Sequence, residues 1–134
     1  MIKPDAVSVE LEVPFHDVDA LKIVWHGHYL KYLEIGRTAY VRSRGLDMAD
    51  VMGLGYRMLV MEVALRYSFP LRYADRLRVT TWCHDKDHRI NLGCEVFNLT
   101  HNRRSARGHC KLVTTDAAGN LLYETPDAIR NLLG

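Results

Sequence analysis

The sequence lacks the features that mark several classes of protein. No apolar run approaches the roughly 18 residues that a membrane-spanning helix needs, so we predict no membrane partner. The first ten residues, MIKPDAVSVE, contain an acid and no apolar stretch, and we expect no secretory signal there. Low-complexity tracts, long linkers and internal repeats are also absent, so we expect a single domain over residues 1–134.

The chain has few cysteines and only a small excess of basic over acidic residues. The three cysteines, Cys83, Cys94 and Cys110, form no CxxC pair, and their odd number argues against a disulfide framework. We therefore expect a cytoplasmic protein in a reducing environment, with Cys94 and Cys110 as small core residues. The formal net charge is only +2 and the basic side chains are scattered among acids, so we predict no nucleic-acid partner.

The first regular element is a predicted strand over residues 7–15. Apolar and polar residues alternate there, which is typical of a half-buried strand. The apolar positions are Val7, Val9, Leu11, Val13 and Phe15. Pro14 cannot donate to a neighbouring strand, so it indicates an edge or the end of the strand.

Apolar residues at helical spacing predict one long helix at about 28–44. The stripe consists of Tyr29, Tyr32, Leu33, Gly36 and Tyr40. Because glycine weakens a helix, Gly36 in this stripe predicts that another element packs closely against it. Gly45 would end the helix, and residues 46–55 would form a short extra turn followed by a loop.

The remainder of the chain is mostly strands. Alternating segments at 59–67, 77–83, 90–96 and 106–112 are connected by the short polar runs DKDHR and THNRRS, which favour hairpins. The order of one strand, one long helix and a run of antiparallel strands predicts an α+β fold. In that fold an antiparallel sheet wraps around one central helix.

The loop before the helix carries a family signature. Its sequence, DVDALKIVWHGHYLKYLE at 17–34, resembles the hotdog-fold acyl-CoA thioesterases, most closely the 4-hydroxybenzoyl-CoA thioesterase and YbgC-like group. The segment YADRLRV at 73–79 and the polar hairpin around Arg89 are also similar to that family. The order of elements fits throughout, so the resemblance covers nearly the whole chain.

The resemblance implies that the chain hydrolyses a thioester without a metal or other cofactor. Asp19 would be the catalytic carboxylate, acting either as a nucleophile that forms a mixed anhydride or as a general base on water. The backbone N–H of His26 would polarise the thioester carbonyl, and the His26 side chain would position water or donate a hydrogen bond. Elementary chemistry agrees, since a helix N-terminus presents unpaired N–H groups for a developing oxyanion.

The resemblance also implies the partners. The substrate would be an acyl-CoA or an acyl-ACP, and the active site would lie between subunits of a homodimer or homotetramer. Predicted substrate-binding residues are Trp25, Gly27, Tyr29, Leu59, Met61 and Arg89. Arg89 would approach the phosphates of CoA, although a charged hairpin tip explains it as well.

The chain departs from the signature at three places, one of which is His28, where relatives carry Asn or Ser. Leu21 and Lys22 replace the usual small pair, and Phe15 replaces a tyrosine. These differences keep open a non-catalytic protein that binds acyl thioesters. A hotdog dehydratase is a further alternative, but its chemistry needs a histidine on the central helix, where only His28 stands at the entrance.

The other polar residues near the loop have simpler interpretations. We predict that Asp17 is structural and bonds loop N–H groups. Asp19, His26 and His28 do not have a recognised zinc spacing, so we predict no metal site. Glu62 is an odd acid on an apolar strand and a candidate second carboxylate.

Overall fold

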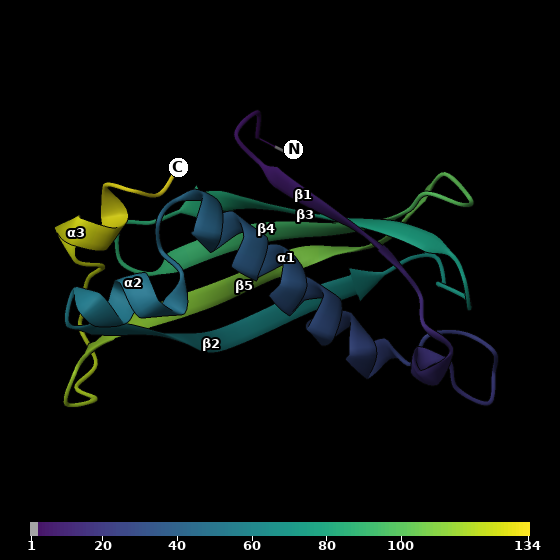
Figure 1. The fold of residues 1–134 in the computed structure, drawn as a ribbon, viewed down its shortest axis with the longest axis horizontal. Helices are drawn as coiled ribbons and strands as arrows, with labels where there is room; N and C mark the ends of the chain where they lie inside the picture. The colour runs from purple at the N-terminus through teal and green to yellow at the C-terminus, as the bar shows by residue number, and fades with distance from the viewer. Residues whose placement is uncertain (1–2) are drawn as a thin grey trace.

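The computed structural model describes residues 3–134 and has one sheet with one long helix across it (Figure 1). The strands are β1 (Val7–Glu12), β2 (Tyr56–Tyr67), β3 (Arg76–Asp85), β4 (Ile90–Asn98) and β5 (Arg103–Asp116). They pair in the order β1-β3-β4-β5-β2, and every pair is antiparallel. The helix is α1 (Tyr29–Ser43), so the predicted sheet, central helix and both hairpins are confirmed.

Short helical elements flank these parts. The 3₁₀ turns η1 (Phe15–Asp17) and η2 (His26–His28) lie on either side of the loop that precedes α1. The helix α2 (Met48–Gly53) replaces the predicted extra turn, and α3 (Asp127–Arg130) follows the last strand. In Figure 1, α3 lies at the end of the sheet opposite the loop before α1.

The helix α1 packs closely on the sheet at Gly36. A Cβ atom at this position would lie 2.5 Å from Cγ1 of Val79 and 3.1 Å from Oγ1 of Thr81. The close packing that Gly36 predicted is therefore confirmed. Gly45 has a positive φ of 69° just beyond the helix, which is the conformation that ends a helix most readily with glycine.

The first strand is shorter than predicted. It ends at Glu12, and Phe15 lies in η1 with 74% of its surface exposed, so the prediction that Phe15 belongs to the buried face was wrong. Val13 is still fully buried, and its N–H donates to the carbonyl of Asp75, the residue just before β3. Pro14 then removes the next backbone donor, which explains why pairing stops there.

The edge strand β2 is far more exposed than its alternating sequence predicted. Residues 59–64 are exposed on both faces, with Leu59 at 51% and Met61 at 50%. The reason is that α1 packs mainly against β1 and β3, so only the short α2 covers part of β2. No strand pairs with the outer edge of β2 within residues 3–134.

Among residues 3–134, no helix is both long and apolar enough to cross a bilayer.

The contact at Gly36 gives a testable expectation. Gly36→Ala should lower the free energy of unfolding by about 1 kcal/mol, because overpacking against Val79 outweighs the better helix propensity of alanine. The matched control is Gly53→Ala at the end of α2, where no atom lies within 4 Å of the new Cβ. Urea unfolding should show the control unchanged or slightly stabilised, and equal effects at both sites would contradict the packing argument.

Candidate active site

The loop between η1 and η2 is closed by its own backbone. Val18 and Val24 form an isolated antiparallel bridge, and the Asp19 N–H donates to the carbonyl of Ile23 at 2.9 Å. The turn needs a positive φ of 64° at Lys22, within the pair where the family signature has small residues. A left-handed conformation costs a non-glycine residue about 1 kcal/mol or more, so the surrounding bonds must hold this turn.

The Asp19 carboxylate is fixed within this turn. Its Oδ1 accepts a hydrogen bond from the Leu21 N–H at 2.8 Å. Leu21 itself is 77% exposed, so its side chain points away from the core. The replacement of a small residue by Leu21 therefore leaves the backbone bond to Asp19 in place.

The entrance of α1 presents backbone N–H groups that have no acceptor within the helix. His26 and Gly27 are the first residues of η2, which continues directly into α1. No helical turn precedes them, so no carbonyl of the helix can accept from their N–H groups. The positive end of the helix dipole lies at the same place. At Gly27 a Cβ would lie 2.2 Å from the Trp25 ring, so glycine allows the indole to lie over the backbone.

Tyr67, at the end of β2, contacts the entrance of α1. Its hydroxyl donates to the carbonyl of His26 at 3.0 Å, and its ring meets that of Tyr29 edge-on at 4.9 Å between centroids. Burial raises the pKa of both phenols, so each stays a neutral hydroxyl at pH 7. The entrance of α1 and the end of β2 therefore form one connected wall.

These elements line an open cavity of about 370 Å³. It is lined by Asp19, Leu21, Ile23, Val24, His26, Tyr29, Tyr67, Ser68, Phe69 and Pro70. The structure thus brings together the predicted residues Asp19, His26 and Tyr29. A neighbouring hollow shares His26 and Tyr67 and adds the predicted residues Trp25 and Gly27. The lining can hold an apolar group beside one carboxylate and backbone donors.

Asp17 anchors the same loop from inside. Its side chain is buried and accepts from Nζ of Lys31 at 2.5 Å and from the hydroxyl of Tyr32 at 2.6 Å. Asp17 is structural as predicted, but the prediction that its side chain bonds loop N–H groups was wrong, because the donors to its carboxylate come from α1. Burial alone would raise the pKa of Asp17, but the bonds from Lys31 and Tyr32 lower it below its ordinary value.

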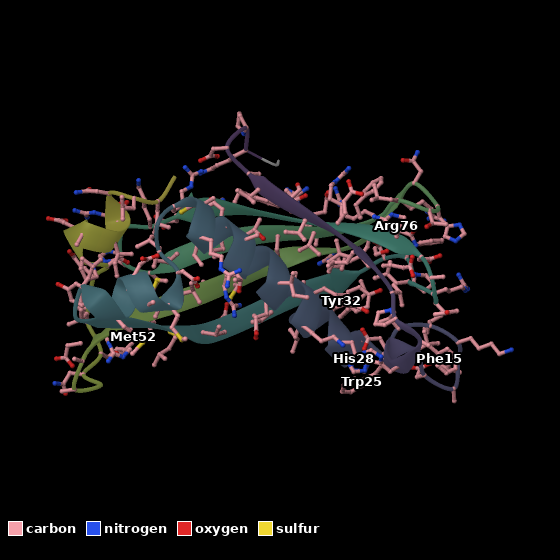
Figure 2. The ribbon with its side chains drawn as sticks, in the orientation of Figure 1. Phe15, Trp25, His28, Tyr32, Met52 and Arg76 are labelled. Carbon is pink, nitrogen blue, oxygen red and sulfur yellow. The ribbon has the colours of Figure 1, made fainter. Side chains whose placement is uncertain are left out.

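The aromatic and basic residues around Asp17 lie together at this end of the molecule. Figure 2 shows Phe15, Trp25, His28 and Tyr32 near the entrance of α1, while Met52 lies at the far end. The Trp25 and His28 rings meet edge-on with centroids 5.4 Å apart. His28 Nδ1 is 4.0 Å from the Asp17 carboxylate, so His28 adds to the positive surroundings of that acid when it is protonated.

Three of the predicted binding residues lie elsewhere in the chain. Leu59 lines a separate cavity beside α2, and Met61 is on the exposed middle of β2. Arg89 donates to the carbonyls of Leu122 and Tyr123, just before α3, and so lies at the end of the sheet opposite Asp19 (Figure 1). A single chain does not bring these residues to the Asp19 cavity.

Glu62 also has ordinary partners. Its Oε2 lies 3.1 Å from Nε2 of His109 and 3.8 Å from Nζ of Lys111, both on the neighbouring strand β5. The hydrogen bond from His109 and the charge of Lys111 lower the pKa of this exposed carboxyl. Among residues 3–134, no group of three or more histidine, cysteine and acidic side chains is arranged to hold a metal ion.

The sequence did not single out the segment Tyr67–Pro70 as part of the site. These residues follow β2 directly and form one side of the cavity. The alternating pattern identified Tyr67 only as a strand residue. The signal that could have marked the segment is the run of a tyrosine, a serine, a phenylalanine and a proline where the strand ends.

The buried Asp17 gives an expectation for stability and pH. Asp17→Asn should lower the free energy of unfolding at pH 7 by about 1–3 kcal/mol, because Lys31 loses its charged acceptor. The folded pKa lies below the ordinary value of 3.8, so this contribution is present above that pH and is lost as the pH falls through the folded pKa.

Urea unfolding of both proteins between pH 7 and about 2 measures this effect. The gap between wild type and Asp17→Asn should narrow below pH 3.8, and the exposed Asp87→Asn should leave stability unchanged throughout. A gap that stays constant down to the lowest pH would contradict the assignment.

Comparison with known proteins agrees with this fold. A family model described as the thioesterase-like superfamily matches residues 13–133. A Bacillus subtilis (strain 168) protein, YneP, whose name describes it as a candidate acyl-CoA thioesterase, is 34% identical over 90 residues. That match covers 66% of this chain and 65% of YneP, so it spans just under two thirds of that relative. A candidate esterase from Synechocystis sp. is 28% identical over 94% of this chain and 77% of its own length.

Solved structures share the fold. A gentisyl-coenzyme A thioesterase has a TM-score of 0.81 at 21% identity, over 96% of this chain and 100% of its own. A Staphylococcus aureus protein solved in complex with CoA has a TM-score of 0.85 at 16% identity, over 98% and 83%. Because the family model covers most of the chain, this protein belongs to the thioesterase-like superfamily, and it has the hotdog fold of these solved structures.

Proposed function

We propose that this protein hydrolyses acyl-CoA thioesters to a free carboxylic acid and CoA. The observation that carries the proposal is the single cavity lined by the Asp19 carboxylate and by the entrance of α1 at His26. A thioester carbonyl in that cavity would have a carboxylate available for its carbon and N–H groups available for its oxygen. The apolar remainder of the lining suits an acyl group.

The chemistry has two versions that use the same residues. In one, an Asp19 oxygen bonds to the carbonyl carbon, the carbon–sulfur bond breaks, CoA leaves as the thiolate, and water then hydrolyses the mixed anhydride. In the other, Asp19 takes a proton from a water that attacks the carbonyl carbon directly. In both, the N–H groups of His26 and Gly27 stabilise the oxyanion, and the bond from Leu21 orients Asp19.

We assign the substrate as a CoA ester and keep acyl-ACP as the alternative donor, since both present the same pantetheine thioester. The three free, buried cysteines suit a reducing compartment, and we propose a cytoplasmic location. The His26 side chain, which is exposed at the mouth of the cavity, is assigned to positioning water or donating to the carbonyl oxygen.

The protein is further proposed to act as a homodimer, or as a homotetramer built from such dimers. Its support is β2, a 12-residue edge strand with exposed apolar side chains on both faces. Unpaired strand edges of this kind are normally covered. Two copies related by a two-fold axis would pair their β2 edges antiparallel and bury these side chains.

Thiol release from acyl-CoA esters tests the catalytic assignment. Asp19→Asn should lower kcat by about 100-fold or more, because the amide cannot serve as nucleophile or base. The matched control is Asp127→Asn, an exposed acid on α3, which should keep wild-type activity. Circular dichroism and thermal unfolding should show both variants folded.

The outcomes separate the alternatives. Equal activity of wild type and Asp19→Asn would contradict the assignment of Asp19 as the catalytic carboxylate. Tight binding of acyl-CoA without turnover by wild type would favour the non-catalytic acyl-thioester-binding protein. Turnover of acyl-ACP alone would move the donor from CoA to the carrier protein, and hydration of an enoyl thioester would indicate the dehydratase.

The dimer has its own test. Val63→Lys places a charge on the exposed β2 edge, where a two-fold axis would bring two such charges together, and it should convert a dimer into monomers. Sedimentation velocity gives the mass, with Leu132→Lys, exposed at the C-terminal end, as the control that should remain dimeric. A monomeric wild type would contradict the proposed edge pairing.

A further inference from the structure

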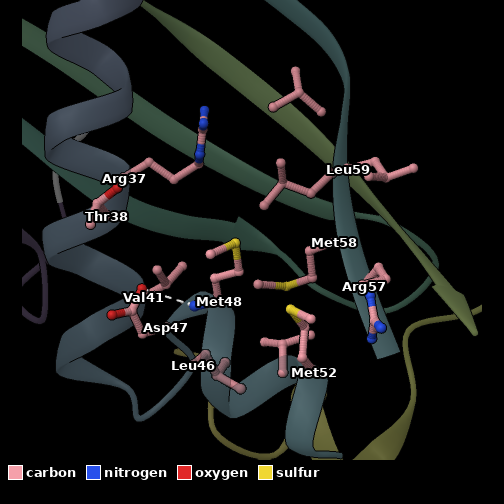
Figure 3. Close-up of a pocket in the computed structure, with 13 residues that line it drawn as sticks. Arg37, Thr38, Val41, Leu46, Asp47, Met48, Met52, Arg57, Met58 and Leu59 are labelled. Atoms are coloured by element: carbon pink, nitrogen blue, oxygen red, sulfur yellow. Dashed lines mark hydrogen bonds between the residues drawn. The ribbon is translucent and has the colours of Figure 1, made fainter. Parts of the chain in front are cut away.

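A second cavity lies away from Asp19, between α1, α2 and β2. Its volume is about 340 Å³. Met48 and Met52 from α2 converge there with Met58 from β2, and Leu59 and Val41 complete much of the apolar wall (Figure 3). Met48 is 74% exposed and Met52 45% exposed, so thioether side chains form an open mouth.

The helix α2 holds one side of this cavity in place. Asp47 caps it by accepting from the Met48 N–H at 2.8 Å, while Asp50 accepts from the Asp47 N–H at 3.0 Å. This reciprocal capping stabilises a helix that is otherwise short. Val51 is buried beneath it, so α2 presents Met48 and Met52 from a fixed backbone.

The lining suits a flexible aliphatic chain. Methionine is unbranched and adapts its shape to what it contacts, so three of them accommodate a chain with many conformers. No aromatic side chain lines this cavity within the described part of the protein. A water molecule occupies about 30 Å³, and a methylene group is of similar size, so the volume holds roughly ten such groups. This corresponds to an acyl chain of about eight to ten carbons.

A positive charge faces the same cavity. The Arg37 side chain extends into it from α1, as Figure 3 shows, and only 22% of that side chain is exposed. Its acidic neighbour, Glu34, is exposed and lies at 3.9 Å, beyond hydrogen-bond distance. Arg37 Nη1 donates to Sγ of Cys110 at 3.7 Å, so the guanidinium is held at the wall of an apolar cavity, where the carboxylate of a free fatty acid could pair with it.

The strand β2 connects this cavity to the Asp19 cavity. Leu59 forms a wall of the methionine cavity, and Tyr67, at the other end of the strand, forms a wall of the Asp19 cavity. Antiparallel pairing of two β2 edges sets the Tyr67 end of one copy beside the Tyr56 end of the other. The methionine cavity of one subunit would then lie next to the Asp19 cavity of its partner.

We infer that the cavity lined by Met48, Met52 and Met58 is the acyl-chain site, and that the substrates are CoA esters of medium-length aliphatic acids. This inference rests on the proposed thioesterase function and on the proposed pairing of β2. It adds the substrate class, which the Asp19 cavity alone does not specify.

The test fills the cavity and varies the acyl chain. Met52→Trp replaces a half-exposed side chain at the mouth, so the core is left intact. We expect wild type to prefer decanoyl-CoA to benzoyl-CoA. In Met52→Trp, kcat/KM for decanoyl-CoA should fall about tenfold or more, mainly through KM, since excluding two or more methylenes is worth at least that factor. Activity on butanoyl-CoA should change less than about twofold.

The matched control is Leu54→Trp, just beyond α2. Leu54 is 46% exposed and lies outside the lining, so this variant should keep wild-type kinetics with both esters. Equal losses of decanoyl-CoA and butanoyl-CoA activity in Met52→Trp would overturn the inference. So would a preference for benzoyl-CoA that Met52→Trp leaves unchanged, although the thioesterase function would then stand.

Binding of decanoate separates this inference from the catalytic proposal. Isothermal titration calorimetry of wild type with decanoate needs no turnover, and binding that Met52→Trp abolishes and Leu54→Trp retains supports the site. If no thioester is hydrolysed but this pattern of binding is seen, the catalytic proposal fails and the aliphatic site remains. If wild type does not bind decanoate, the methionine cavity is not an acyl-chain site.

Discussion

The buried carboxylate of Asp17 is the constraint on which the site depends. It accepts from Lys31 and Tyr32 on α1, and its own carbonyl accepts from the Trp25 N–H. The two ends of the loop are thereby fixed to the helix that follows. A buried charge without such partners would cost several kcal/mol, so the loop can fold only with the start of α1 in place. Asp19 and His26 take their positions from this arrangement.

The position of α1 on the sheet, away from β2, determines which parts of the sheet are covered. Because Gly36 seats the helix over β3, the outer part of the sheet is left with only α2 above it. The same displacement that closes the core beneath α1 opens a cavity beside α2 and leaves β2 exposed. The close packing of α1 on the sheet and the exposed edge strand β2 therefore both follow from the position of α1 over β3.

The sequence predicted most of the fold because its signals were local. Period-two and helical spacing identified the strands and α1, and the signature around Asp19 identified the family. Phe15 and β2 were predicted less well, since the exposure of an apolar residue depends on which helix covers it, and no local pattern records that. Asp17 was correctly predicted to be structural, but its hydrogen-bond partners were not, because Lys31 and Tyr32 lie on α1 and not in the loop. The lining residues Tyr67 to Pro70 meet Asp19 only through tertiary packing.

The two cavities differ in the way their walls are held, and this difference suits different tasks. Around Asp19, backbone bonds, the Tyr67 hydroxyl and the Asp17 cluster fix each polar group, as the positioning of a reacting carbonyl requires. Beside α2, the backbone is fixed but the methionine side chains can rearrange. Chemistry needs the first kind of wall, and acceptance of several chain lengths needs the second. With β2 as a wall of both, one strand edge would link reaction geometry to substrate choice across a dimer.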